Sequence, residues 1–155
     1  MGKINLGRVV LGGLLAGVVL NVLEFINGLI LRDRWMAARE ALGLGPEGTG
    51  MMIAWVIWGF LLGIAMVWLY AAIRPRFGPG PKTAVWAGLT AWFLIGLLGF
   101  GTTAIGGMFP TGLVVISLIW GLFELPIATV VGAWPYQEGG AAPSAGAEPS
   151  APPAM

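Results

Sequence analysis

The sequence contains no cysteine and no histidine, and only 10% of its 155 residues are charged. Without cysteine there is no disulfide, no thiolate nucleophile and no thiolate ligand for zinc or iron–sulfur clusters. Without histidine the chain lacks the commonest haem and catalytic-metal ligand and the commonest general base near neutral pH. We therefore predict a non-enzymatic protein that holds no metal and no cofactor.

The scarcity of charge also excludes an ordinary soluble domain, in which roughly 25% of residues are charged. Hydrophobic residues make up 57% of the chain and the mean hydropathy is +0.87. A net charge of +1 is too small for the dense basic surface that nucleic-acid binding requires. The composition therefore predicts a protein surrounded by the lipid bilayer, with no nucleic-acid partner.

Four apolar stretches are each close to the ~20 residues that a helix needs to cross the hydrocarbon core. They cover residues 9–31, 51–73, 83–105 and 111–134, and arginine, glycine or proline flanks each of them. The first stretch is longer than the ~7–15-residue core of a signal peptide, so we expect it to be retained. The pattern predicts an all-α, polytopic four-helix bundle over residues 1–136.

The segments outside these spans differ in character. In the loop from Arg32 to Gly50, Trp35, Ala38 and Leu42 share one helical face, which predicts a short amphipathic helix at the membrane interface. Residues 137–155 consist largely of alanine, proline, glycine and serine and have little to bury. We predict that this tail is disordered.

The basic residues near the span ends indicate the orientation of the bundle. One side carries five of them, which are Lys3, Arg8, Arg74, Arg76 and Lys82. The opposite side carries three, Arg32, Arg34 and Arg39, together with the acidic Asp33, Glu40 and Glu47. Because cytoplasmic flanks are enriched in lysine and arginine, we predict that both termini lie in the cytoplasm.

Two carboxylates, Glu24 and Glu124, interrupt the first and fourth spans. A charged side chain near the bilayer centre costs ~2.5 kcal/mol or more, so such residues usually face the bundle interior and often mark a site. Asn21 and Asn27 lie one turn to either side of Glu24, and Ser117 lies two turns before Glu124 on the same helix face. These five residues form the candidate intramembrane polar site.

The helical rise of ~1.5 Å per residue gives the depths of the two glutamates. Glu24 lies about 24 Å from the membrane edge near Arg8, and Glu124 about 15 Å from the same edge near Trp134. A stagger of roughly 9 Å follows, which predicts two successive polar stations rather than a pair that shares one proton.

Small residues predict close helix packing. Glycines recur at helical spacing in three of the spans, and five were selected as helix-packing residues: Gly13, Gly17, Gly59, Gly63 and Gly121. In a chain with 26 glycines this pattern favours packing within the bundle and self-association equally.

Five runs of sequence resemble a set of small uncharacterised bacterial four-helix inner-membrane proteins of unknown function. The runs are NVLEFING at 21–28, WGFLLG at 58–63, WLYAAIRPRFGPG at 68–80, WGLFE at 120–124 and GAW at 132–134. The resemblance implies the same topology and a place in the bacterial inner membrane, with no activity to transfer. Its members usually continue with Leu-Tyr after the last Ala-Trp, whereas Pro135 intervenes here, so the fourth helix should stop sharply.

The glutamates admit three interpretations, and these lead to two classes of function. A glutamate can clamp two helices through a hydrogen bond, carry a proton or cation, or contact a partner subunit or ligand. We expect an accessory or structural subunit that packs in a larger membrane complex or a homo-oligomer. The alternative is a small proton- or cation-coupled transporter or channel that uses Glu24 and Glu124.

Overall fold

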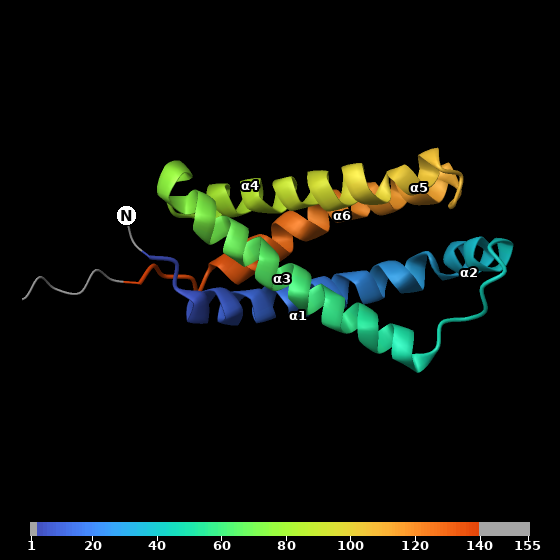
Figure 1. Ribbon diagram of the computed structural model, residues 1–155, viewed down its shortest axis with the longest axis horizontal. Coiled ribbons are helices and arrows are strands. Elements are labelled where there is room, and N and C mark those ends of the chain that lie inside the picture. The colour runs from blue at the N-terminus through green and yellow to red at the C-terminus, as the bar shows by residue number, and fades with distance from the viewer. Residues whose placement is uncertain (1–2, 140–155) are drawn as a thin grey trace, which may run out of the picture.

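The computed structural model describes residues 3–139 and is all-α (Figure 1). The helices are α1 (Leu6–Ile30), α2 (Arg32–Ala41), α3 (Thr49–Phe77), α4 (Pro81–Ala91), the π-helix η1 (Trp92–Phe100), α5 (Thr102–Ile105) and α6 (Thr111–Ala133). Residues 137–139 follow α6, and the Gly139 N–H donates to the Lys3 carbonyl at 3.2 Å. The rest of the predicted disordered tail, residues 140–155, lies outside the described residues.

Four helical segments are long and apolar enough to cross a membrane, which confirms the predicted bundle. They are Leu6–Ile30, Thr49–Phe77, Pro81–Ile105 and Thr111–Ala133. The second segment continues four residues past the predicted end at Ile73, because a proline in the last turn, Pro75, removes only one backbone donor. It stops at Gly78, whose φ of 84° favours glycine.

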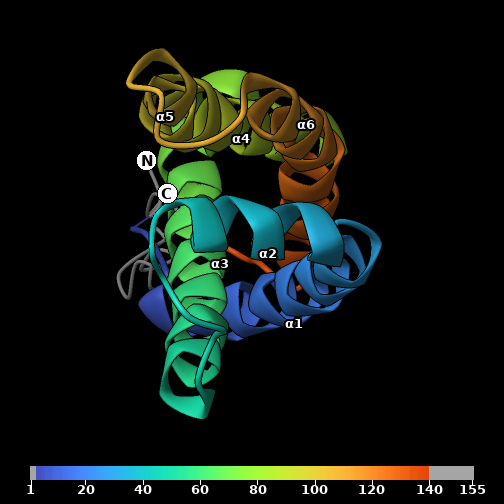
Figure 2. The ribbon, with the colours of Figure 1, turned by 90° about the vertical axis from the view of Figure 1, so that its right-hand side faces the viewer.

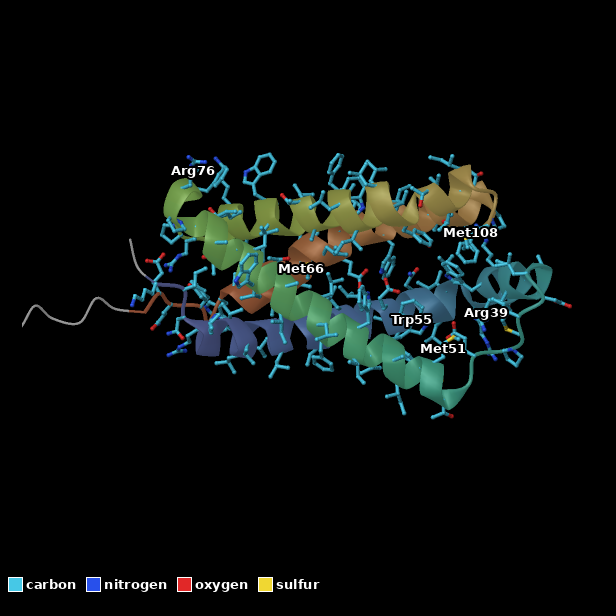
Figure 3. The ribbon with its side chains drawn as sticks, viewed as in Figure 1. Arg39, Met51, Trp55, Met66, Arg76 and Met108 are labelled. Carbon is cyan, nitrogen blue, oxygen red and sulfur yellow. The ribbon has the colours of Figure 1, made fainter. Side chains whose placement is uncertain are left out.

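The four spans pack around a core at the end of the bundle where α1 begins and α6 ends. Helix α1 contacts α3 and α6, while α4 contacts α6 and α3 (Figures 1 and 2). Most of the buried side chains there are small or medium-sized: Val9, Ala16, Leu20, Met66, Val67, Ala71, Ala84, Ala87, Ala91, Ala128 and Ala133, with Tyr70 and Tyr136. Met66, labelled in Figure 3, lies between the spans.

Glycines bring α1 and α3 into backbone contact. A Cβ atom on Gly17 would lie 2.8 Å from the Cα of Phe60, and one on Gly63 would lie 2.6 Å from the backbone nitrogen of Gly17. A Cβ on Gly13 would overlap the backbone and side chain of Ile64. These close approaches make three of the predicted packing glycines part of the contact within the bundle.

The other two predicted packing glycines make room for polar side chains. Gly59 lies beside Asn21, whose amide nitrogen would be 2.8 Å from a Cβ atom at that position. Gly121 and Gly96 flank the indole of Trp92, which donates its N–H to the Leu118 carbonyl at 2.8 Å. This bond joins the π-helical part of the third span to α6.

The opposite end of the bundle is closed by the short helix that was predicted in the first loop. Helix α2 packs Trp35 and Ala38 against Leu113 at the start of α6 and Phe109 in the preceding loop. The rings of Trp35 and Phe109 meet edge to face, with centroids 5.3 Å apart. The third residue of the predicted apolar face, Leu42, is exposed because the helix ends at Ala41.

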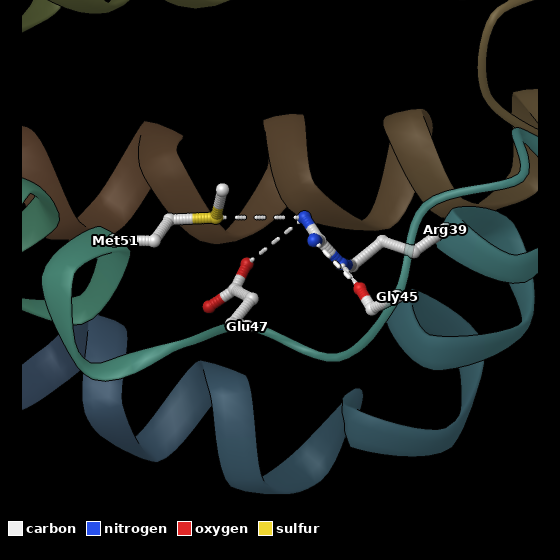
Figure 4. A network of polar contacts seen from close by, with 4 residues as sticks. All are labelled: Arg39, Gly45, Glu47 and Met51. Atoms are coloured by element: carbon white, nitrogen blue, oxygen red, sulfur yellow. Dashed lines mark hydrogen bonds and ion pairs between the residues drawn. The ribbon is translucent and has the colours of Figure 1, made fainter.

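Arg39 ties the loop after α2 to the start of α3 (Figure 4). Its guanidinium donates to the Gly45 carbonyl at 2.8 and 3.1 Å and lies 3.5 Å from a carboxylate oxygen of Glu47. The guanidinium nitrogen that faces Glu47 is also 3.6 Å from the sulfur of Met51, the third residue of α3. The loop that returns the chain to the membrane therefore has a defined path.

Candidate intramembrane carboxylate site

Glu124 is the most deeply shielded acidic side chain in the described spans. It lies in the middle of α6, and only 3% of its surface is exposed. One of its carboxylate oxygens, Oε1, has no hydrogen-bond partner among the described residues. A buried polar atom without a partner is costly, which makes this oxygen a candidate binding atom.

Glu24 lies on α1, which packs against α6, the helix that carries Glu124. The Glu24 side chain is exposed, so the prediction that both glutamates are shielded is wrong for this residue. Asn27, one turn further along α1, is buried and donates from its amide nitrogen to Glu24 Oε2 at 3.4 Å. Two helices thus bring together two carboxylates and one amide.

The contact between α1 and α6 gives a second estimate of the stagger between the glutamates. The two antiparallel helices meet at Gly12 and Gly132, where a Cβ on Gly12 would overlap the Gly132 carbonyl. From that crossing, Glu24 is twelve residues away and Glu124 eight, and the helical rise then gives a stagger of about 6 Å.

The remaining two predicted site residues do not join the carboxylates through hydrogen bonds. Asn21 donates its amide to the Gly17 carbonyl at 2.8 Å and to the Val56 carbonyl of α3 at 3.3 Å. It therefore connects α1 to α3. The hydroxyl of Ser117 is buried and has no hydrogen-bond partner among the described residues.

One face of α6 carries three buried polar atoms without partners in the described part of the chain. They are the Ser117 hydroxyl, the Trp120 indole nitrogen and Glu124 Oε1. Because the spacing is i, i+3 and i+7, the three side chains follow one stripe along the helix. The stripe combines a hydroxyl, an N–H donor and a carboxylate in otherwise apolar surroundings.

A cavity of ≈ 360 Å³ lies beside Glu124, between α1 and α6. Apart from Glu124, its lining consists of Leu23, Ile116, Ile119, Trp120, Phe123 and Ile127. Three of these residues, Ile119, Phe123 and Ile127, are more than half exposed on the outer surface of the bundle. The cavity therefore opens sideways, toward the region that lipid chains occupy in a membrane.

The chemistry available at this site is that of carboxylates. The one basic residue of α1 and α6 is Arg8, near the start of α1 and more than four turns from Glu24, so no basic side chain of these two helices shares the depth of the glutamates. In residues 3–139, histidine, cysteine, aspartate and glutamate nowhere gather in a group of three or more. The arrangement can bind a proton or a cation, or hold the two helices together through a hydrogen bond.

Sequence reasoning identified the acidic residues of the site but not the walls of its cavity. Leu23, Ile119 and Phe123 look like any other apolar residues of a membrane span, so the sequence carries no signal that separates a cavity wall from a lipid-facing surface. An indole N–H deep in a span requires an acceptor, but Trp58 and Trp92 lie as deep in their spans as Trp120, so this signal does not single out the cavity either.

Comparisons with family models, with curated proteins and with solved structures produced no match for this chain.

Proposed function

We propose that this protein is a small, non-enzymatic transporter or channel that binds a proton or a cation at Glu24 and Glu124. The observation that supports the proposal is the Glu124 carboxylate, which is buried in the middle of α6 with an unpartnered oxygen, while α1, the helix that carries Glu24, packs against α6. Like charges in a medium of low dielectric constant repel strongly, and the one basic residue of α1 and α6, Arg8, lies far from the glutamates near the start of α1. A bound proton or cation supplies the missing positive charge.

The experiment that tests this function measures flux in lipid vesicles that contain the purified protein. With a pH gradient across the membrane, we expect proton or sodium movement at least tenfold above that of protein-free vesicles. The double variant Glu24→Gln/Glu124→Gln should fall to the protein-free level, because glutamine neither binds a proton at neutral pH nor carries charge. Wild-type flux equal to that of protein-free vesicles, over inward and outward gradients of both ions, would contradict the proposal.

An accessory subunit in a larger complex or a homo-oligomer is the second candidate, and the first half of α3 favours it. All residues from Thr49 to Trp58 are exposed, and two of them are tryptophans, Trp55 and Trp58. The beginning of α3 extends beyond α1 (Figure 2), and α3 first meets α1 where the Val56 carbonyl accepts a hydrogen bond from Asn21. A partner helix would cover an apolar face of this kind.

Purification in a mild detergent distinguishes the two candidates. If the protein is an accessory subunit, we expect a second membrane protein in stoichiometric amount, or a single oligomer of the chain, by native mass spectrometry. Replacing Trp58 with serine should then dissociate the assembly. A wild-type protein that remains monomeric at all detergent concentrations would count against this candidate.

We also propose that the protein lies in the bacterial inner membrane with both termini in the cytoplasm. In Figure 1, the α3–α4 turn and the described chain ends lie at the same end of the bundle, which brings the five basic residues of their flanks together. An excess of lysine and arginine on one side is typical of the cytoplasmic face.

Labelling of single cysteines tests this orientation without background, because the natural chain has no cysteine. In intact cells with a permeable outer membrane, a membrane-impermeant maleimide should label Glu47→Cys in the first loop. Gln137→Cys, after α6, should react only once the inner membrane is broken. Both positions are exposed, so whether each cysteine is labelled depends only on whether the maleimide reaches its side of the membrane. The reverse labelling pattern would place the termini outside.

A further inference from the structure

The cavity between α1 and α6 has the composition of a binding site for an amphipathic molecule. Its walls are aliphatic and aromatic, and the only acidic group among its lining residues is Glu124. Its volume of ≈ 360 Å³ lies within the range of ~300–1,000 Å³ that is usual for small-molecule sites. The ligand that fits therefore has a large apolar part and a single polar group.

We propose that this cavity binds a lipophilic ammonium cation, with the nitrogen at Glu124 and the apolar body against Trp120 and Phe123. The inference rests on the proposed function and names the class of cation that the carboxylate pair accepts. Glu124 is 97% shielded and carries an unpartnered oxygen. An ammonium group donates hydrogen bonds and supplies a positive charge beside Glu124, which no lysine or arginine among the cavity-lining residues provides.

The surroundings of Glu124 favour an organic cation over an inorganic one. Calcium requires six to eight oxygen ligands, and magnesium keeps several waters in a near-octahedral shell. Here Glu124 is the only carboxylate among the residues that line the cavity, and apart from the Trp120 indole nitrogen the other lining side chains are hydrocarbon. An ammonium ion with an apolar body needs fewer oxygen partners, and aromatic faces such as that of Trp120 attract cations.

The side opening of the cavity is consistent with entry from the bilayer. Ile119, Phe123 and Ile127 border the cavity and are exposed at the outer surface of α6. A lipophilic amine partitions into the membrane, where its apolar body is at the depth of these residues. Glu24, which is exposed and close to Glu124, adds a second negative group for such a cation.

The test compares two probes that differ in charge and have nearly the same shape, 1-naphthylmethylammonium and the neutral 1-naphthylmethanol. Binding to the full-length protein in lipid nanodiscs is measured by calorimetry, after subtraction of binding to empty nanodiscs. We expect the wild type to bind the ammonium probe at least tenfold more tightly than the alcohol. Glu124→Gln should abolish this preference, and Glu40→Gln, which removes an exposed carboxylate of α2, should leave it unchanged.

A second variant tests the cavity without changing any charge. Ile119→Trp places a larger side chain in the cavity wall and should weaken binding of the ammonium probe at least fivefold. Ile57→Trp is the matched control, because Ile57 has a similar exposed fraction but lies on α3 and does not line the cavity. Both variants must retain the wild-type melting temperature for the comparison to hold, and Ile119→Phe replaces the tryptophan variant if it does not.

The outcomes separate this inference from the proposed function. Equal binding of the two probes by the wild type would show that the cavity takes an apolar guest such as a lipid chain, and would overturn the inference. A preference that survives Glu124→Gln would also overturn it. Glutamate-dependent proton flux without a preference for the ammonium probe would support the proposed transport function and contradict only the proposed ammonium site. Ammonium binding that depends on Glu124, without flux of any ion, supports the site and refutes transport.

Discussion

Gly13→Leu should separate α1 from α3 and lower the free energy of unfolding by about 3 kcal/mol or more. A Cβ atom at this position overlaps the backbone and side chain of Ile64, and backbone atoms cannot move aside as a side chain can. Leucine adds three further carbon atoms in the same place. The helices would have to move apart, and the neighbouring contact of Gly17 with Phe60 would be lost with them. Unfolding by SDS from a mild detergent, followed by circular dichroism, measures the loss.

Gly28→Leu is the matched control for this prediction. Gly28 lies on the same helix, but a Cβ atom there meets nothing within 4 Å. Leucine also has a better helix propensity than glycine, so we expect no loss of stability. If the two variants were equally destabilised, the loss would come from leucine itself and not from the contact between the helices.

Glu124→Gln should lower proton or cation flux at least tenfold and leave the stability of the bundle unchanged or slightly higher. Glutamine has the same shape as glutamate, so the packing of α6 is preserved. It removes one of two neighbouring negative charges, and its amide can donate a hydrogen bond to Glu24. Flux and thermal unfolding, measured on the same preparation, separate the two effects.

Glu24→Gln should have a smaller effect on flux, a reduction of about threefold, because Glu124 remains ionisable and keeps its buried oxygen. Glu40→Gln serves as the control, since Glu40 lies on α2 outside the spans. A purely structural hydrogen-bonded clamp makes the opposite prediction. In that case Glu124→Gln would lower the melting temperature, while flux would stay at the protein-free level in every variant.

The architecture was predictable from the sequence because span length and hydropathy are local properties. The four spans and the helix after the first were found within a few residues of their bounds, and Pro135 correctly predicted that α6 stops near Trp134. The nine-residue π-helix η1 was not predicted. At its first residue, Trp92, the indole lies against Gly96 and against Gly121 of α6, and this contact between spans has no local sequence pattern.

The site was predictable in its residues but not in its geometry. A carboxylate in an apolar span is visible in any sequence, which is why Glu24 and Glu124 were selected. Whether they meet depends on where α1 and α6 cross, and with 26 glycines in the chain the sequence does not single out Gly12 and Gly132 as the crossing point. For the same reason Asn21 was placed with the glutamates, although its hydrogen bond to Val56 is directed to α3.

The crossing of α1 and α6 at Gly12 and Gly132 divides the molecule into two regions with different tolerance to substitution. At the crossing, the backbones of the two helices are in contact. A side chain added at either glycine would therefore push α1 and α6 apart. Two to three turns away, around Glu24 and Glu124, the helices are separated by side chains and a cavity. Ligand preference can therefore be redesigned there, by changing wall residues such as Ile119 and Phe123, while the scaffold that holds the helices is left untouched.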